Sequence, residues 1–340
     1  MTRRVAWSAI FAVAAAGALV PLPQGTVERW YSNGVYPAIQ RVLTRVSNLL
    51  PFAIFDVLCL GALVATALCV YRSVRDAGWK RGTLHAGAIL ARSAAVLYIA
   101  FLAVWGLNYR RVPLTEKLDF DASRITTRGA SQLGDRAVAT LNRLYGPAHA
   151  SSTPLDALAS YLQDALRALG GPGSIVPGRP KQTLLGEYFH QASVAGMTDP
   201  FFLETLIAPD LLDVERPFVI AHEWAHLAGY ADESEANFAA YLACRRGDAA
   251  AQYSAALMLI GYVHPSRPLN EALEIGPRID LYAIRYRYSR TNETLRFAAR
   301  EGYDKYLKAN RVQRGVESYD AVLQLILGTE LDADGRPRLR

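Results

Sequence analysis

The sequence predicts a mainly α-helical membrane protein, in which a region of three transmembrane helices precedes a helix-rich α+β domain. Three long apolar runs lie in the first third of the 340-residue chain. Each run approaches the ~20 residues that span a bilayer as a helix, and no later run does. The residues after the third run are enough for one folded domain with its own core. The predicted division is therefore a membrane region, 1–111, and a second domain, 112–340.

The basic residues around these runs predict their orientation. The runs are Val5–Leu22, Pro51–Tyr71 and Ala86–Leu107. Cytoplasmic loops of membrane proteins carry an excess of Lys and Arg. Arg3 and Arg4 precede the first run, and the predicted loop Arg72–His85 contains four further Lys or Arg residues. Both are predicted to be cytoplasmic, which leaves Gln24–Leu50 and everything after Asn108 on the other side.

The first run also has features of a cleaved signal peptide, including the small-residue stretch Ala14–Ala18. That alternative leaves the second domain on the same side, because the other two runs form a hairpin. Trp30 and Tyr31 suit an interfacial aromatic belt. Asp56 is expected near the outer end of the second run, and Arg92 near the cytoplasmic end of the third, where it can snorkel.

The composition favours a lipid bilayer as partner and excludes nucleic acid. The chain is 51% hydrophobic and 20% charged, with a net charge of +6. A basic balance could indicate nucleic-acid binding, but these basic residues flank the apolar runs, and no basic stripe alternates with aromatic residues. Cys59, Cys69 and Cys244 all lie in apolar segments and do not form a disulfide framework.

The second domain is predicted to consist of helices with a small strand component. After the connector Asn108–Asp121, Gly170–Pro180 is a predicted loop because it is rich in Gly and Pro. Ser193–Leu206 has strand character, and Thr198–Leu206 is either an edge strand that holds an extended peptide or an ordinary core strand. The predicted helices are Arg136–Tyr145, Pro154–Leu169, Pro217–Gly229, about Glu233–Arg245, Ala249–Tyr262, part of Pro268–Arg290, Asn292–Ala309 and Tyr319–Leu327.

An HExxH motif at residues 222–226 is the most informative feature of this domain. His222 and His226 are four residues apart and share one face of a helix. That face can present two imidazole nitrogens to a single zinc ion, and Glu223 can reach the zinc-bound water as general base. Two hydrogen-bonded histidines on a buried helix are the alternative, but the intervening Glu favours a metal site.

The third metal ligand has three candidates. Asp232 completes HExxHxxGxxD, the metzincin spacing with Asp in place of the third His. Asp232 is also a candidate helix N-cap, with Glu235 as its capping-box partner. That interpretation accounts for both residues and leaves Glu233 available. Glu233 is therefore preferred, while Glu235 and Asp232 stay open.

The motif resembles a known class of enzymes. HExxH followed by Glu233-Ser-Glu-Ala-Asn237 is similar to the HExxH…ExxAD arrangement of membrane gluzincins, the CAAX prenyl protease and HtpX class. The resemblance implies a zincin-like domain in which Glu233 is the third zinc ligand. Two departures bear on that ligand: Asn237 replaces the Asp, and the spacing from His226 to Glu233 is very short.

A closer likeness covers nearly the whole chain. It rests on the order of the three apolar runs and on short segments that include Asn108–Arg110, Gly229–Ala231, Glu235–Phe238, Tyr303–Lys308 and Gly315–Tyr319. These resemble an uncharacterised bacterial family of membrane-anchored HExxH proteins, catalogued as a domain of unknown function. The likeness implies a multi-pass protein of the bacterial inner membrane with a metal site, but it implies no substrate.

Zinc peptidases usually add a side chain that stabilises the oxyanion. Tyr319 ranks first because it lies in the Ser-Tyr segment of the likeness, although it could simply pack the last helix. The other candidates are Tyr253, Tyr262, His264 and Arg278. Structural or solvated roles are expected for His149 and His190, and Trp224 is expected to face away from the metal and pack the helix. Lys181 is expected to be a loop charge with no assigned role.

The leading hypothesis is a membrane-anchored zinc metallopeptidase with Zn²⁺ as cofactor. It would hydrolyse peptide bonds of proteins or peptides at the extracytoplasmic face, with Glu223 as general base. One alternative keeps the zinc but makes the protein a hydrolase or amidase of cell-envelope material. Another is a non-catalytic, zinc-stabilised membrane sensor or assembly module, against which Glu223 argues because a structural site has no use for it.

Overall fold

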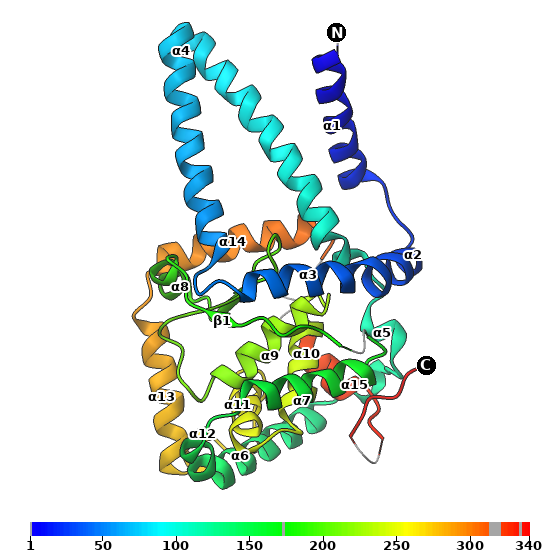
Figure 1. Ribbon diagram of the computed structural model, residues 1–340. Helices are drawn as coiled ribbons and strands as arrows, with labels where there is room; N and C mark the ends of the chain where they lie inside the picture. Colours follow the sequence, from blue (N-terminus) through cyan, green and yellow to red (C-terminus); the bar gives the residue numbers. More distant parts are fainter. Residues whose placement is uncertain (1, 172–173, 313–320, 333–334) are drawn as a thin grey trace.

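The computed structural model describes residues 2–171, 174–312, 321–332 and 335–340. The chain is mainly helical, as the sequence predicts, with 70% of residues in helices and 4% in strands. Figure 1 shows a long helical hairpin and α1 (Thr2–Leu19) rising from a body of packed helices. The N-terminus lies at the far end of α1, and the C-terminus lies on the body.

The hairpin is α4 (Ile54–Val104), whose 51 residues form two arms that meet at Gly78. Among the described residues, α4 is the one helix that is by itself long and apolar enough to cross a bilayer. The prediction of a loop at Arg72–His85 is wrong, because these residues are helical on both sides of Gly78. Arg, Lys and Ala favour helix, and glycine alone reverses the chain easily at a φ of 73°.

α1 packs against α4 and ends at Leu19, short of the predicted Leu22. A Cβ on Gly17 would lie 2.7 Å from Leu102 Cδ1, so glycine permits the close approach. Arg92 lies over the ring of Trp7. α2 (Gln24–Thr26), the π-helical η1 (Val27–Val35) and α3 (Tyr36–Asn48) follow. α1 and this second segment are long and apolar enough to cross a bilayer only when taken together, as a pair of helices bent by 112°.

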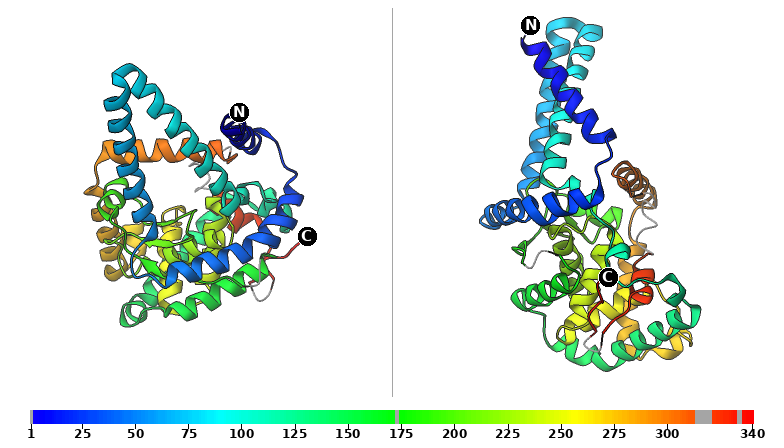
Figure 2. Two further views of the ribbon diagram at one scale, coloured as in Figure 1. Left: turned by 45° about the horizontal axis from the view of Figure 1, so that its top comes forward. Right: turned by 90° about the vertical axis from the view of Figure 1, so that its right-hand side faces the viewer.

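Two helices run across the base of the hairpin. α3 and α14 (Glu293–Ala309) lie on opposite sides of that base in Figure 1 and in the right-hand view of Figure 2. After α4 the chain enters the body through η2 (Gly106–Arg110), α5 (Leu114–Lys117) and η3 (Ala122–Arg124).

The body consists largely of helices that the sequence predicts. They are α6 (Thr127–Ala150), α7 (Leu155–Ala168), α9 (Arg216–Leu227), α10 (Glu233–Cys244), α11 (Ala249–Ile260), α12 (Leu269–Ala272), α13 (Ile275–Ser289) and α15 (Ala321–Gly328). α6 begins earlier than predicted because the Thr126 hydroxyl caps it, accepting the Gly129 N–H at 3.0 Å. The short helix α8 (Gly186–Ala192) is not predicted.

A small sheet lies beside α9, with strand order β1 (Pro180–Lys181), β3 (Thr205–Ile207), β2 (Gly196–Thr198). β1 is parallel and β2 antiparallel to β3, so β2 is an edge strand. The predicted strand Ser193–Leu206 is interrupted after Thr198. There the Asp199 carboxylate accepts the N–H groups of Phe201 and Phe202 at 3.0 and 2.7 Å, which turns the chain.

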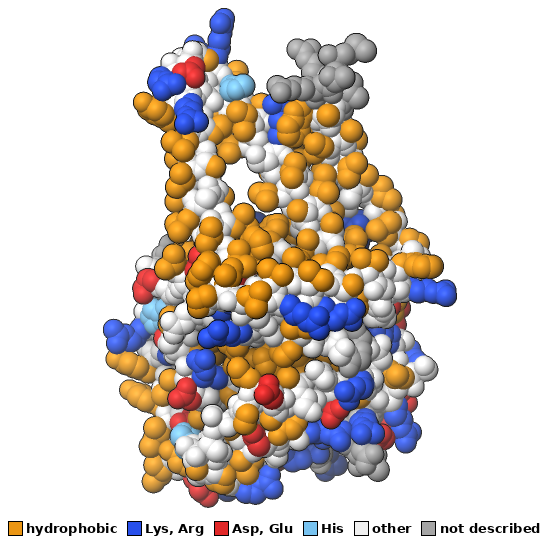
Figure 3. Space-filling model, viewed as in Figure 1, with side chains coloured by type: hydrophobic (Ala, Val, Ile, Leu, Met, Phe, Trp, Pro, Cys, Tyr) orange, Lys and Arg blue, Asp and Glu red, His pale blue; other side chains and the backbone are white. Residues whose placement is uncertain are grey.

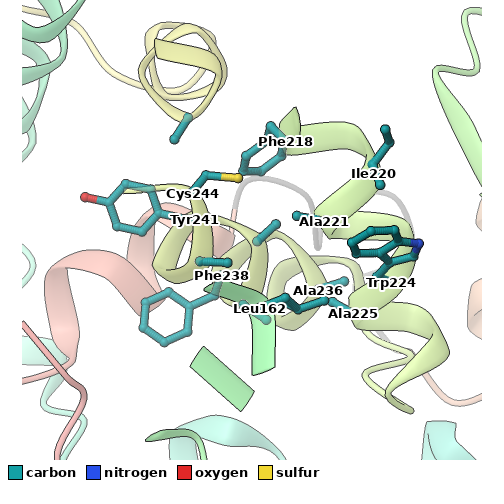
Figure 4. Close-up of a cluster of buried hydrophobic side chains, with 14 of the residues drawn as sticks. Leu162, Phe218, Ile220, Ala221, Trp224, Ala225, Ala236, Phe238, Tyr241 and Cys244 are labelled. Carbon is teal, nitrogen blue, oxygen red and sulfur yellow. The ribbon is translucent and has the colours of Figure 1, made fainter. Parts of the chain in front are cut away.

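α9 and α10 pack side by side at the centre of the body (Figure 4). Ala221, Ala225 and Ala236 are completely buried, and such small side chains allow close packing of the two helices. Trp224 is also buried, and its indole N–H donates to the Gly178 carbonyl at 2.8 Å. The apolar sides of α9 and α10 are thereby fixed, and their remaining sides are free to hold polar groups.

A buried ion pair connects the sheet to the start of the hairpin. Lys181 Nζ lies 2.6 Å from Glu204 Oε1, with side chains only 1% and 0% exposed. Lys181 also donates to the carbonyls of Ser47 and Phe52, and Glu204 accepts the N–H of Phe55. The expected loop charge at Lys181 is therefore a buried structural charge that holds the α3–α4 connection against β1.

Candidate metal centre

α9 presents two histidines on one face. Pro217 lies in its first turn, where the missing N–H leaves no hydrogen bond unmade. Gly229 follows its end with a φ of 86°, a conformation that favours glycine. The imidazoles of His222 and His226 project one turn apart, with their Nε2 atoms 3.1 Å from each other.

The start of α10 separates the three candidate carboxylates. Asp232 accepts the N–H groups of Ser234 and Glu235 at 2.9 and 3.3 Å, so its side chain is the N-cap of α10. Glu235 Oε1 accepts the N–H of Leu114 at 2.6 Å, at the start of α5. Asp232 is thus the predicted N-cap, but the predicted capping box is wrong, because Glu235 binds the start of α5 and not the N–H of Asp232. Neither carboxylate belongs to the group that the histidines form.

Glu233, the first residue of α10, completes a three-membered cluster with the histidines. Its Oε2 lies 3.2 Å from His222 Nε2 and 3.5 Å from His226 Nε2. Ligand atoms around a tetrahedral zinc ion are about 3.3–3.5 Å apart, given Zn–N and Zn–O distances near 2.1 Å. This is the one group of at least three His, Cys, Asp or Glu residues at ligand spacing in the part of the chain that the structure describes.

Several contacts hold this cluster in position. His226 Nδ1 lies 2.7 Å from the Tyr230 carbonyl, so an Nδ1–H donates there, and in the neutral imidazole the Nε2 lone pair faces the cluster. The Tyr303 hydroxyl of α14 donates to Glu233 Oε1. Glu233 Oε2 is buried and makes no hydrogen bond to any described residue. A cation between Oε2 and the two Nε2 atoms would satisfy all three, so these residues fit a divalent metal ion.

The electrostatics of the cluster favour a positive charge. Burial lowers the pKa of His226, but the Glu233 carboxylate outweighs it and the pKa is raised to about 9. Burial likewise opposes ionisation of Glu233, yet the two imidazoles hold the pKa of that carboxyl well below its usual range. The side chains of His226 and Glu233 are 9% and 2% exposed, and that of His222 is 13% exposed, so the cluster meets solvent on the His222 side.

Glu223 lies on α9 beside the edge strand β2. Its carboxylate is buried, and the Thr198 hydroxyl lies 2.9 Å from Oε2 and 2.8 Å from the Glu223 carbonyl oxygen. A Cβ on Gly196 would lie 2.7 Å from Oε1, so β2 passes directly against this carboxylate. Burial raises the pKa of Glu223, while the neighbouring imidazoles act in the opposite direction.

The predicted oxyanion residues are not brought to the cluster by any contact that the structure describes. Tyr319, the first choice, lies outside the described residues. The Tyr253 hydroxyl donates to Asp280 of α13, and Arg278 donates to the Asn270 carbonyl at 3.1 Å. Tyr262 and His264 lie in the turn after α11.

Sequence reasoning missed Tyr303, the residue that contacts Glu233. Tyr303 and Glu233 are 70 residues apart, and no local pattern links them. The only signal was its place in the segment Tyr303–Lys308 of the family likeness. Two of the other histidines pair with carboxylates, in keeping with structural roles: His149 with Asp280 at 3.2 Å and His190 with Asp210 at 2.6 Å.

Fold and site together define a mainly helical chain with a helix able to cross a membrane and a His–His–Glu group that could hold a metal ion. The chain belongs to the family described as "Protein of unknown function (DUF3810)", which matches residues 31–327. The expectation of an uncharacterised family is thereby confirmed. No curated protein and no solved structure matches the chain. The matched range contains α4, α9 and α10, so one family includes both the hairpin and the cluster.

Proposed function

We propose that this protein is a membrane-anchored zinc metallopeptidase, with three transmembrane helices and a zincin-like domain on the extracytoplasmic side of a bacterial inner membrane. The observation that carries this proposal is the cluster of His222, His226 and Glu233 at tetrahedral spacing, with Glu223 on the same helix. Structural zinc sites are closed by four protein ligands, whereas catalytic sites have three and an open position. Three ligands beside a buried carboxylate support the catalytic kind.

The shape of α4 supports the membrane part of the proposal. Each arm, Ile54–Ala77 and Trp79–Val104, exceeds the ~20 residues that cross a bilayer. Basic side chains gather at the hairpin tip (Figure 3), which favours a cytoplasmic tip. The opposite end contacts the body, where Asp56 accepts the N–H of Leu184 at 2.8 Å. The body would then lie outside the cytoplasm.

The chain's own residues supply the base and its orientation. A zinc ion bound to the cluster would polarise a substrate carbonyl and lower the pKa of a water molecule. Glu223 would accept the proton of the attacking water and return it to the leaving amine. Thr198 fixes Oε2, so the carboxylate is held in one orientation.

The edge strand β2 supports a peptide as the substrate. An extended peptide can add to an exposed sheet edge through main-chain hydrogen bonds. A segment paired with β2 would run beside Glu223, because Gly196 already contacts that carboxylate. The proposed substrates are therefore extended segments of proteins or peptides at the outer membrane face.

Metal content and proteolysis of the full chain in nanodiscs test the proposal together. The measurements are zinc per chain by elemental analysis and cleavage of fluorescein-labelled casein. The wild type should hold about one zinc ion. Glu223→Gln should keep the zinc and lose activity about 100-fold or more. Glu233→Gln should lose the zinc, whereas the matched control Glu235→Gln should keep it, because an amide oxygen can still accept the Leu114 N–H.

Two results would overturn the proposal. One is a wild-type protein that holds no zinc even after zinc is added back. The other is Glu223→Gln protein that cleaves casein as fast as the wild type.

A further inference from the structure

α3 is an amphipathic helix with its polarity reversed relative to a helix of a water-soluble body. Such helices normally bury an apolar stripe against the core. The side chains that α3 and the end of η1 bury are instead polar or hydroxylated: Ser32, Tyr36, Gln40, Thr44 and Ser47, each 0–1% exposed.

Hydrogen bonds explain why this polar side faces the body. Gln40 donates to the Val176 carbonyl at 2.7 Å and accepts the Val176 N–H at 3.1 Å. The Thr44 hydroxyl donates to the Leu203 carbonyl at 3.0 Å. Asn48 donates to the Pro177 carbonyl at 3.0 Å. α3 therefore satisfies the backbone of two loops and cannot turn its other side inward without leaving these groups unpaired.

The outward side of α3 is an apolar stripe. Its members recur at intervals of three and four residues, as one helix face requires. They are Val35, Ala38, Val42, Val46 and Leu49, and all are exposed, Leu49 by 80%. Arg41 and Arg45 are exposed along one flank of the stripe. A row of five exposed apolar positions does not suit contact with water.

The stripe is continuous with the lipid-facing surface proposed for α4. Leu49 is followed by Phe52, which is 51% exposed, and then by Val57 on the first arm, 57% exposed. Figure 3 shows hydrophobic side chains covering the hairpin above a row of Lys and Arg at the level of α3. Because α3 runs across the hairpin axis, its axis is parallel to any bilayer that α4 crosses (Figure 1).

We propose that α3 lies in the plane of the membrane surface, with its apolar stripe in the headgroup–acyl boundary and Arg41 and Arg45 among anionic lipid headgroups. Helices with an apolar face and a basic flank bind anionic bilayers in this way. Continuity with α4 favours lipid over a protein partner. The proposal rests on α4 entering the bilayer and is independent of the metal chemistry.

This arrangement would hold the candidate metal centre at a fixed height above the bilayer. The Tyr36 hydroxyl of α3 donates to the Leu227 carbonyl, at the end of the helix that contains His222 and His226, at 2.9 Å. A buried hydrogen bond thus connects the proposed interfacial helix directly to the metal-binding helix. Segments close to the membrane surface would reach the site most readily.

Depth-dependent fluorescence quenching tests the proposal in the full chain. Single cysteines at Val42, Ile279 and Leu63 are labelled with the NBD fluorophore, in a chain whose Cys59 and Cys69 are replaced by Ala. Cys244 is completely buried and stays. Val42 and Ile279 are matched exposed apolar positions, 61% and 56% exposed, but Ile279 lies on α13, in the body. Leu63 reports on α4 and is 67% exposed.

The labelled proteins are reconstituted in vesicles of phosphatidylcholine and phosphatidylglycerol that contain lipids with a nitroxide near the headgroup. The label at Val42 should emit at shorter wavelength than the label at Ile279 and lose most of its fluorescence to the nitroxide. Changing both Arg41 and Arg45 to Gln should reduce that quenching, most strongly at high phosphatidylglycerol content.

Equal, weak quenching at Val42 and Ile279 would overturn the proposal, provided that a deep nitroxide quenches Leu63. A blue-shifted Val42 label that no nitroxide quenches would also overturn it, because protein and not lipid would then cover the stripe. Lack of quenching at Leu63 would instead refute membrane insertion of α4, on which both this proposal and the anchored part of the proposed function rest.

Discussion

Replacement of Tyr303 by Phe tests whether the phenol holds Glu233 in place as a metal ligand. The substitution removes one hydroxyl and keeps the ring, which stacks on Tyr306 with centroids 5.8 Å apart. The lost interaction is a hydrogen bond from Tyr303 to the carboxylate of Glu233, a side chain that is only 2% exposed. Because the Glu233 carboxylate is so little exposed, bulk water cannot readily replace the lost hydrogen bond.

The expected effect on zinc affinity follows from the strength of that bond. A hydrogen bond to a charged group contributes about 1.5–3 kcal/mol. If the whole contribution orients the ligand, the dissociation constant for zinc rises roughly 10- to 150-fold, since about 1.4 kcal/mol corresponds to tenfold. Loss of a partner that orients a metal ligand typically costs 10- to 100-fold in affinity, which agrees.

The assay is competition for zinc against a fluorescent chelator, with the full chain in nanodiscs. Tyr306→Phe is the matched control, because it removes the same group from the neighbouring ring, whose hydroxyl lies 3.5 Å from that of Tyr109. Zinc affinity should fall in Tyr303→Phe and change little in Tyr306→Phe. Equal affinity in Tyr303→Phe and the wild type would refute the reasoning, as would tighter binding.

Three further changes probe the surroundings of the site. Gly196→Ala should keep zinc but lower casein cleavage, because the added Cβ would lie 2.7 Å from Glu223 Oε1 and must displace that carboxylate. Zinc content and casein cleavage are measured as for the wild type. Lys181→Met should destabilise the fold by about 3–5 kcal/mol by leaving Glu204 buried without its cation, and the double variant with Glu204→Gln should recover part of the loss in chemical denaturation. Burial raises the pKa of Asp199 from 3.8 to about 7, so its contribution to stability is complete below pH 3.8 and is lost as pH rises through about 7. The thermal midpoint should therefore fall between roughly pH 4 and pH 7, and Asp199→Asn should flatten that fall.

The elements that local chemistry determines could be predicted from the sequence. Pro217 in the first turn and Gly229 beyond the end bound α9 within a residue or two, and Asp232 does the same for the start of α10. The apolar runs indicated α4, but hydropathy alone does not show that helix continues through charged residues. The turn of the hairpin depends on one glycine, Gly78.

Capping logic in the sequence favours Glu233 as the third candidate ligand, but only the geometry separates it from the other two carboxylates. Asp232, Glu233 and Glu235 differ little in composition or spacing. Asp232 caps α10, and Glu235 accepts a hydrogen bond from the N–H of Leu114, which lies 121 residues earlier in the chain. Only the packing of α5 against α10 shows that Glu235 faces away from the histidines. Tyr303 was missed for the same reason, because its contact with Glu233 depends on the position of α14.

The division at residue 112 stays a prediction, and contacts at the end of α9 argue that residues 112–340 do not hold the cluster alone. Trp105 donates to the His226 carbonyl at 3.1 Å, and Tyr36 donates to the Leu227 carbonyl at 2.9 Å. Both donors lie in the predicted membrane region, and both side chains are buried. Without them, the Leu227 carbonyl loses the one partner that the structure describes, at about 1–3 kcal/mol if it stays buried. The His226 carbonyl keeps the Gly229 N–H at 2.9 Å but loses its bond from Trp105. A fragment 112–340 should therefore bind zinc more weakly than the full chain in the chelator assay, and unfold at lower temperature. Equal affinity and equal stability would show that the domain holds its own metal site, and that these contacts serve only to attach it to the membrane region.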